Sequence, residues 1–188
     1  MNKTVSILTE GAMCIALAFV LSFIQYSGSW LQGGSVTLEA VPIIIFGMRH
    51  GLKWGLGTGF VYSCLCLIMG FNNVLYCPTL LTQIGCVMLD YIFAYTILGA
   101  AGLFVKIFKN KKAGYPLAAF TVSFLKFVCH YISGIWLWGE YAPEGQPVWL
   151  YSLIYNGTYM LADTVIAVVL VTILIITYPG ILTGKKRM

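Results

Sequence analysis

Two ionisable residues, Lys126 and His130, interrupt a stretch that is otherwise typical of a membrane-buried helix, FLKFVCHYISGIWLWGEY (124–141). A charge at the centre of a bilayer costs at least ~2.5–3.5 kcal/mol, and such groups usually mark a functional path or a pocket. Residues four apart share one helix face, so Lys126, His130, Gly134 and Trp138 form a strip. On this strip Gly134 would leave room for a ligand to approach.

Further polar residues lie within or at the start of other apolar runs: Glu39, Asp90, Asn156 and Asp163. Mutual neutralisation, with Lys126 paired to Asp90, is one explanation for the buried charges. A purely structural pair, however, can often be replaced by apolar residues at little or no cost in stability. We therefore favour a ligand site in which these groups converge. For Asp163, which has no comparable neighbours, we favour hydrogen bonds to nearby residues only.

Aromatic residues are dense near residue 150, where tyrosines repeat every four positions: Tyr151, Tyr155 and Tyr159. Trp and Tyr are enriched at membrane–water interfaces, and this tendency is the favoured explanation for Trp149 and Tyr141. Trp138 and Tyr151 stand next to the buried ionisable groups in this reading. For these two we favour a place in the pocket.

A small aromatic cation is the ligand that suits these groups best. Carboxylates with stacked Trp and Tyr rings form a cage for a flat cation, and a cation–π contact reaches ~2 kcal/mol or more when desolvated. Asn156, Tyr151 and His130 could add hydrogen bonds to a heteroaromatic ring. A lysine fits such a site if it holds Asp90 or donates to a ring nitrogen or hydroxyl.

The elements that must position these residues are membrane helices. Of 188 residues, 60% are hydrophobic and 9% are charged, and the mean hydropathy is +0.88, which excludes a soluble globular domain. Six apolar runs cover residues 8–27, 38–48, 54–70, 79–105, 115–138 and 148–178. Six spans of ~30 Å use nearly the whole chain. The sequence therefore predicts an all-α integral membrane protein, a six-helix bundle forming a single domain over residues 1–188.

The second run, 38–48, is too short to span a bilayer alone. We expect it either to tilt against its neighbours or to work together with the glycine-containing segment WLQGGSVT (30–37). Irregular backbone is tolerated at membrane depth only where it is buried in protein or lines a cavity.

Basic residues predict the orientation. All Lys and Arg residues except Lys126 fall at alternate ends of the runs: Lys3, Arg49, Lys53, Lys106, Lys109, Lys111, Lys112, Lys185, Lys186 and Arg187. The connectors 27–37, 71–78 and 139–147 contain none. The positive-inside rule places both termini in the cytoplasm and the acidic loop 139–147 outside. The net charge of +5 reflects this topology and gives no reason to expect nucleic acid.

The sequence carries no pattern of an enzyme, a metal site or an ATPase. The string GILTGKKR lacks the spacing and the Ser/Thr of a phosphate-binding loop, and His130 has no visible nucleophile or metal partner. The cysteines form no C-x-x-C pair and are expected to be small core residues: Cys14, Cys64, Cys66, Cys77, Cys86 and Cys129. The first run has no small-residue cleavage site, so no cleavable signal peptide is expected.

Several ordered motifs resemble those of the thiamine-specific S components (ThiT/YuaJ family) of energy-coupling factor (ECF) transporters. They are LTEGAMCIALAF, QGGSVTLEAVPI followed by GMRHGLKWG, LLTQIGCVMLDY, LKFVCHYISG and YAPEGQPVWLYSLIYNGTYM. The resemblance covers nearly the whole chain. It implies a six-helix S component that captures thiamine, an aminopyrimidine joined to a cationic thiazolium, from the extracellular side.

By position, the ligand residues of that family fall on Glu39, Asp90, Tyr91, Lys126, His130, Gly134, Trp138, Tyr151 and Asn156. The resemblance implies that the two carboxylates serve the aminopyrimidine and the charge balance, while the indole and the imidazole stack on the rings. The Tyr151 hydroxyl, the Asn156 amide and the Gly134 backbone would satisfy polar edges, and Lys126 would orient Asp90.

The chain also departs from the family pattern. Some members carry Glu where Asp90 stands, which shortens the reach here by one methylene. A pocket Trp of some members aligns with Tyr62, and Trp30 in the first outer loop is a candidate lid residue.

The same resemblance implies partners: a transmembrane T subunit and two ATPase subunits, which alone would use ATP, with no cofactor in this chain. Ala12 and Ala16 lie one turn apart, and small residues at this spacing permit close helix approach in lipid. In the resemblance this face docks the T subunit; ordinary internal packing is the alternative. An S component for another vitamin or aromatic cation is an alternative function, and a solitary carrier, for which no internal repeat is visible, is another.

Overall fold

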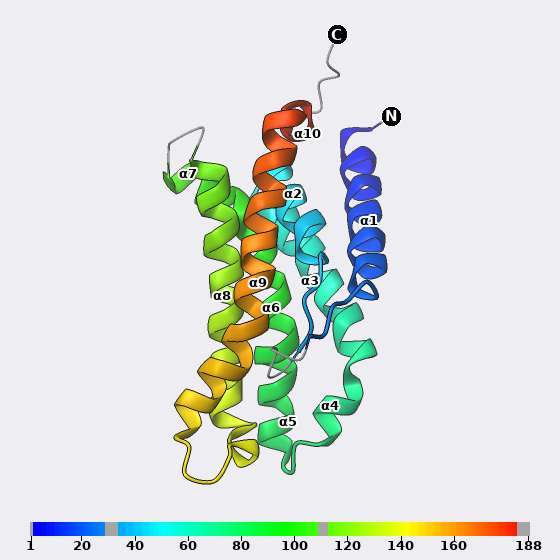
Figure 1. Cartoon of the computed structure of the whole chain (residues 1–188). Helices are drawn as coiled ribbons and strands as arrows, with labels where there is room; N and C mark the ends of the chain where they lie inside the picture. Colours follow the sequence, from blue (N-terminus) through cyan, green and yellow to red (C-terminus); the bar gives the residue numbers. More distant parts are fainter. Residues whose placement is uncertain (1, 29–33, 109–112, 184–188) are drawn as a thin grey trace.

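The computed structural model describes residues 2–28, 34–108 and 113–183, which form an almost entirely helical bundle (Figure 1). The long helices are α1 (Lys3–Ser22), α3 (Leu52–Met69), α8 (Gly114–Trp136) and α9 (Val148–Thr177). A further helical run, Leu80–Phe108, is composite. These five are long and apolar enough to cross a membrane, and α2 (Ala40–His50) is a shorter apolar helix. The predicted class, an all-α membrane bundle built from six apolar runs, is confirmed.

The composite run changes helix type along its length. It consists of α5 (Leu80–Cys86), a π-helical turn η1 (Val87–Phe93), α6 (Ala94–Thr96), a 3₁₀ turn η2 (Ile97–Ala100) and α7 (Ala101–Phe108). Short helices complete the described chain: α4 (Phe71–Leu75), η3 (Gly139–Tyr141) and α10 (Gly180–Thr183). π-Helical turns are rare and frequently occur at functional sites. The turn η1 centres on Asp90, a candidate ligand residue.

The chain runs back and forth along the bundle, so that the start of α1, the end of α7 and α10 lie at the same end (Figure 1). Ion pairs and a hydrogen bond tie helices together there. Arg49 Nε lies 3.0 Å from Glu10 Oε1, His50 Nε2 lies 3.2 Å from Glu10 Oε2, and Arg49 Nη1 donates to Ile181 O at 2.8 Å. We call this end the basic end. The connectors 70–79 and 137–147 lie at the opposite end, which we call the connector end (Figure 1).

The first helix ends earlier than its apolar run predicts. α1 stops at Ser22 instead of Ser27, and the chain continues as extended backbone. Tyr26 and Val36 exchange two backbone hydrogen bonds of 3.0 and 2.9 Å, which close this segment on itself. It leads directly into α2. The short run 38–48 was expected either to tilt against its neighbours or to work together with irregular backbone. For residues 34–37 the structure bears out the second expectation.

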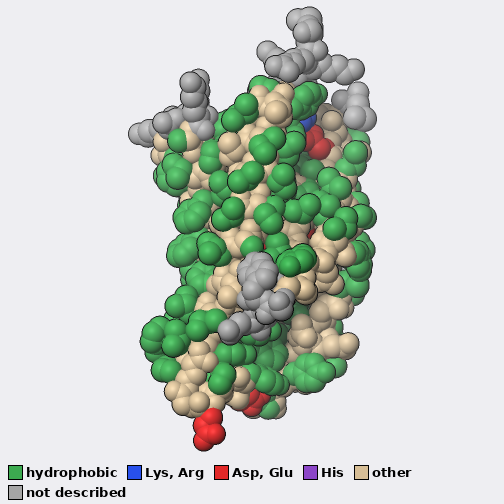
Figure 2. Space-filling model, in the orientation of Figure 1, with side chains coloured by type: hydrophobic (Ala, Val, Ile, Leu, Met, Phe, Trp, Pro, Cys, Tyr) green, Lys and Arg blue, Asp and Glu red, His purple; other side chains and the backbone are tan. Residues whose placement is uncertain are grey.

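The outer surface of the bundle is apolar. Figure 2 shows hydrophobic side chains spread over most of the visible face, with charged side chains mainly at the two ends. On α1, large side chains such as Met13 and Val20 are 68% and 57% exposed. An exposed apolar surface of this extent is expected of a protein whose surroundings are lipid.

Four glycines let α2, α3 and the composite run cross at close range: Gly47, Gly55, Gly99 and Gly102. A Cβ on Gly55 would collide with the carbonyl oxygen of Gly99, and a Cβ on Gly99 would collide with that of Gly55. Because side chains are absent there, the backbones touch, which is the usual way in which membrane helices gain van der Waals contact.

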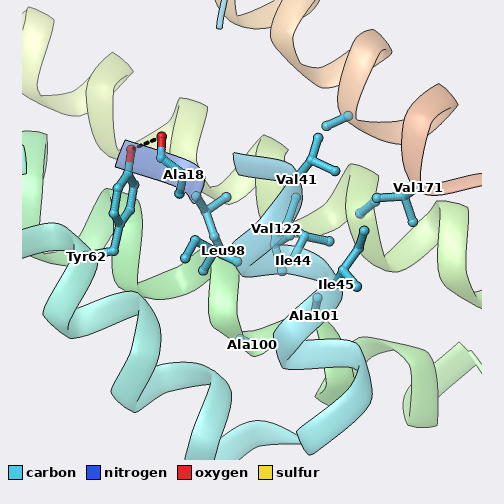
Figure 3. Packing of buried hydrophobic residues seen from close by; sticks show 13 residues of the cluster. Ala18, Val41, Ile44, Ile45, Tyr62, Leu98, Ala100, Ala101, Val122 and Val171 are labelled. Carbon is cyan, nitrogen blue, oxygen red and sulfur yellow. Dashed lines mark hydrogen bonds between the residues drawn. The ribbon is translucent and has the colours of Figure 1, made fainter. Parts of the chain in front are cut away.

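Apolar side chains pack together in a buried core (Figure 3). This core lies between the candidate site and the basic end. Ile44, Leu98, Val122 and Val171 are fully buried in it. Val122 stands one helical turn from Lys126 toward the basic end, so the apolar core begins directly beyond the buried charges. Interiors of this kind are close-packed, with few voids large enough for a water molecule.

Candidate ligand-binding site

A cavity of about 850 Å³ lies inside the half of the bundle nearer the connector end. Its walls come from the end of α1, the segment 34–39, α3, η1, α8 and α9. Tyr76 and Tyr141 also line it and are 69% and 55% exposed, so the cavity reaches the surface at the connector end. Pockets that hold drug-sized molecules are typically ~300–1,000 Å³. The size therefore suits a small organic ligand.

Glu39 and Lys126 form a buried ion pair in the cavity wall. Lys126 Nζ lies 3.3 Å from Glu39 Oε1, and the two residues are 6% and 7% exposed. The hydroxyl of Tyr62 donates to Glu39 Oε2 at 2.7 Å. Lys126 Nζ also lies 4.4 Å from the ring centroid of Tyr95, within cation–π range. The ion pair thus allows both charges to be buried, whereas either charge alone would be costly to bury.

Two donors hold Asp90, one on α8 and one just beyond the end of α8. His130 Nδ1 lies 3.2 Å from Asp90 Oδ1, and the indole N–H of Trp138 donates to Asp90 Oδ2 at 3.1 Å. A histidine donates to this carboxylate whenever Nδ1 carries a proton, which is the case in one neutral tautomer and in the imidazolium. The arrangement fixes the imidazole and the indole on one carboxylate. Both rings line the cavity, as the spacing of the α8 strip predicts.

The predicted pairing of Lys126 with Asp90 is wrong. Lys126 pairs with Glu39 from the start of α2, and Asp90 pairs with His130. The partners of a buried charge are chosen by how the helices pack, and Glu39 lies 87 positions away in the chain. The interpretation of Lys126 as the residue that orients Asp90 fails with the pairing.

Gly134 allows α8 and α9 to approach each other. A Cβ at Gly134 would collide with Ser152 and Asn156, so α9 fills the space that the sequence had suggested for a ligand. Asn156 Nδ2 donates to His130 O and Ser152 O, each at 3.2 Å, and its Oδ1 accepts from Tyr159 at 3.2 Å. Both Gly134 and Asn156 line the cavity. Their visible contacts, however, join the two helices that carry the site.

Two predicted residues stand at the edge of this arrangement. Tyr62 is fully buried and reaches the site only through its hydrogen bond to Glu39, so it lies behind the cavity wall. Tyr91 lines the cavity, but its hydroxyl donates to Gly70 O at 2.8 Å and accepts from Asn73 Nδ2 at 3.2 Å. Trp30, the candidate lid residue, lies outside the described residues.

The tyrosines of the sixth run line the cavity together. Tyr151, Tyr155 and Tyr159 follow one face of α9, and the rings of the first two lie 5.6 Å apart. Tyr141, which the sequence assigned to the interfacial belt, also lines the cavity, with its ring 6.1 Å from that of Trp138. At 55% exposure Tyr141 stands at the rim of the cavity, where the turn η3 lies beside the start of α9. Trp149 is 53% exposed, as a belt residue should be.

The cavity also includes residues that the sequence did not single out for it. Asp163 lines it, and its Oδ1 accepts a hydrogen bond of 2.8 Å from the backbone N–H of Thr37, so the expectation of purely local bonding was wrong. Tyr95, one turn beyond Tyr91, lies under the Lys126 ammonium. The i, i+4 spacing of the two tyrosines, next to Asp90, was a signal that could have found Tyr95.

The two alanines proposed as a partner face, Ala12 and Ala16, are exposed on α1. Ala12 lies near the middle of α1 and Ala16 one turn further from the basic end, and neither lines the cavity. The cysteines were expected to be small core residues. Cys77 and Cys86 are buried, whereas the other four are half-buried: Cys14, Cys64, Cys66 and Cys129.

These features define a multi-pass membrane protein with an internal cavity for a small solute. The chain belongs to the thiamine transporter protein family (Thia_YuaJ), whose sequence model matches residues 8–183. It is 34% identical over 197 residues to the thiamine transporter ThiT of Bacillus subtilis, with 98% of each chain covered. It is 33% identical over 194 residues to ThiT of Lacticaseibacillus paracasei, covering 98% of this chain and 94% of the other.

A solved structure of ThiT from Listeria monocytogenes has the same fold. The TM-score is 0.76 at 26% identity, with 96% of this chain and 99% of that chain covered. The resemblance inferred from the motifs is therefore confirmed. These relatives are named as transporters, which confirms the prediction that the chain is not an enzyme.

Proposed function

We propose that this chain is the thiamine-binding S component of an ECF-type importer. It captures extracellular thiamine in the cavity and delivers it across the cell membrane together with ATP-driven partner subunits. The observation that carries the proposal is the set of groups lining one cavity in a member of the thiamine transporter family. Carboxylates, an imidazole, an indole and several tyrosines converge there.

The chemistry of thiamine matches these groups. Its thiazolium is a permanent cation, which carboxylates and aromatic faces stabilise in a desolvated site. Its aminopyrimidine offers a flat ring with donors and acceptors, which the Trp138–Asp90–His130 arrangement could stack on and bond. Glu39 and Tyr151 are the further ligand residues we propose, with Lys126 holding Glu39. Gly134 and Asn156 support the site by joining α8 to α9.

We propose that the basic end faces the cytoplasm and the connector end faces outward. Lys3 begins α1, Arg49 lies in the last turn of α2, and Lys106 lies in the last turn of α7, so these cations gather at the basic end. The connectors at the other end contain no Lys or Arg. The positive-inside rule then directs the cavity to the extracellular side.

Transport across the membrane requires the partners, in this proposal a T subunit and two ATPases. Ala12 and Ala16 are exposed on a helix that only a few buried residues hold to the bundle, among them Gly11 and Ala18. A helix with such a small-residue face can accept a partner helix at close range.

Two measurements test the proposal. The purified, detergent-solubilised chain should bind thiamine, and an excess of a chemically unrelated vitamin should not displace it. The variant Ala12→Leu/Ala16→Leu should keep thiamine binding but lose complex formation and ATP-dependent uptake. Lack of thiamine binding would refute the capture step. Uptake at the normal rate by the double variant, or by this chain in liposomes without an ATPase, would refute the partner mechanism.

A further inference from the structure

The charged groups that line the cavity do not balance. Within the described chain they are three carboxylates, one lysine and one histidine: Glu39, Asp90, Asp163, Lys126 and His130. Glu39 is neutralised by Lys126 at 3.3 Å, and Asp90 is held by His130 at 3.2 Å. Even with the histidine protonated, one negative charge is left over.

The leftover charge resides on Asp163. Among the described residues, Asp163 forms no ion pair with Lys, Arg or His. Its hydrogen-bond donor in the described part of the chain is neutral: the backbone N–H of Thr37 donates to Oδ1 at 2.8 Å. One neutral hydrogen bond orients a carboxylate but does not cancel its charge. Lys126, the cation that interacts electrostatically with Asp163, already forms its ion pair with Glu39. A carboxylate in a membrane-embedded cavity that has only this shared countercharge is costly, and a cation entering the cavity lowers that cost.

The surroundings of Asp163 suit an organic cation. Tyr159 stands four residues before it on the same face of α9, and both side chains line the cavity. The segment that carries Thr37 packs against Tyr159, since a Cβ on Gly34 would lie 2.6 Å from the tyrosine ring. An aromatic face next to an unpaired carboxylate is the combination that stabilises a flat cation.

We propose that Asp163 is the residue that gives this cavity its preference for a positively charged ligand over a neutral one of the same shape. The inference rests on the proposed function, because it assigns a role within the same cavity. The carboxylate supplies the countercharge for the ligand cation, whereas Glu39 and Asp90 are already satisfied by the protein and contribute shape and hydrogen bonds.

A purely structural role for Asp163 makes a different prediction. If Asp163 only anchors Thr37, and so positions the segment that leads to Glu39, its loss should weaken the binding of every ligand to the same degree. The variant Asp163→Asn separates the two roles, because the Asn oxygen can still accept the Thr37 N–H while the charge is gone. Two unit charges several ångströms apart in a partly buried site interact by enough to change affinity about tenfold or more.

The test compares thiamine with a neutral analogue that carries a thiophene ring in place of the thiazolium. Equilibrium binding of both is measured to the purified wild-type chain and to Asp163→Asn. Asp163→Asn should weaken thiamine about tenfold or more and leave the neutral analogue within about twofold. Retained binding of the analogue also shows that the variant is folded.

The outcomes that contradict the inference are distinct. Equal weakening of both ligands, or unchanged binding of thiamine, in Asp163→Asn would overturn the role of Asp163 while the wild-type chain still binds thiamine. Failure of the wild-type chain to bind thiamine would instead overturn the proposed function on which the inference rests. A charge-retaining Asp163→Glu variant should keep the preference for the cation.

Discussion

The buried pair Lys126–Glu39 allows a prediction about stability that is independent of any ligand. Replacing Lys126 by Met keeps the length and the apolar stem of the side chain but leaves the carboxylate of Glu39 without its countercharge. Glu39 is 7% exposed and would retain only the hydroxyl of Tyr62 as a donor. Removal of one partner from a buried ion pair typically costs ~3–5 kcal/mol.

The lower end of that range applies here. Both side chains line the cavity, where water can reach the carboxylate, so we expect a loss of about 3 kcal/mol. A chain of this size loses about 2–4 °C in Tm per kcal/mol, which gives a decrease of about 6–12 °C. The double variant Glu39→Gln/Lys126→Met removes both charges and should recover most of the loss, with a coupling energy of about 2 kcal/mol.

The assay is thermal unfolding of the purified chains in one detergent, at one protein concentration and without thiamine. Lys53→Met is the matched control, because Lys53 is exposed and an exposed substitution usually changes stability by less than about 0.5 kcal/mol. The reasoning is refuted if Lys126→Met unfolds no earlier than Lys53→Met. It is equally refuted if the double variant is no more stable than Lys126→Met.

Three further predictions address packing, stacking and topology. Gly55→Ala should lower Tm markedly, because the added Cβ would collide with the backbone of a neighbouring helix. On the same helix, the Cβ of Gly57→Ala would meet nothing within 4 Å, so this control should be neutral or stabilising. Equal Tm values for the two variants would contradict the close crossing. Thiamine should change the tryptophan emission of the chain, and Trp138→Phe should remove most of that change, whereas the control Trp149→Phe should not. A change that survives in Trp138→Phe would show that the ligand binds elsewhere. A cysteine at the exposed Glu144 should react with an impermeant reagent added outside intact cells, and protection would reverse the proposed orientation.

The strip on α8 was predictable because its signal is local. Lys126 and His130 follow helical spacing on α8, which carries both to one cavity, and Trp138, two residues beyond the end of α8, continues the strip to the same cavity. The class of the protein was predictable for a similar reason, since apolar runs of spanning length leave few alternatives to a membrane bundle. Predictions that needed only the geometry of one helix agree with the structure.

The partners of the charges were not predictable, because they depend on contacts between distant segments. Glu39 and Lys126 are 87 positions apart, and Asp163 bonds a backbone N–H 126 positions away. No side-chain pattern announces a bond to a backbone group. The π-helical turn around Asp90 adds a second difficulty, since it rotates the residues that follow it relative to an ideal α-helix.

The apolar core beneath the cavity has an electrical consequence. Residues such as Ile44, Val122 and Val171 are sealed from solvent between the cavity and the basic end. An ion that tried to pass through them would lose its hydration without any compensating partner, at a cost of order 20 kcal/mol in an idealised low-dielectric interior. The chain is therefore an insulator: in this conformation it can fill with solute without carrying current. A cell could produce this chain in large amounts and still keep its membrane potential.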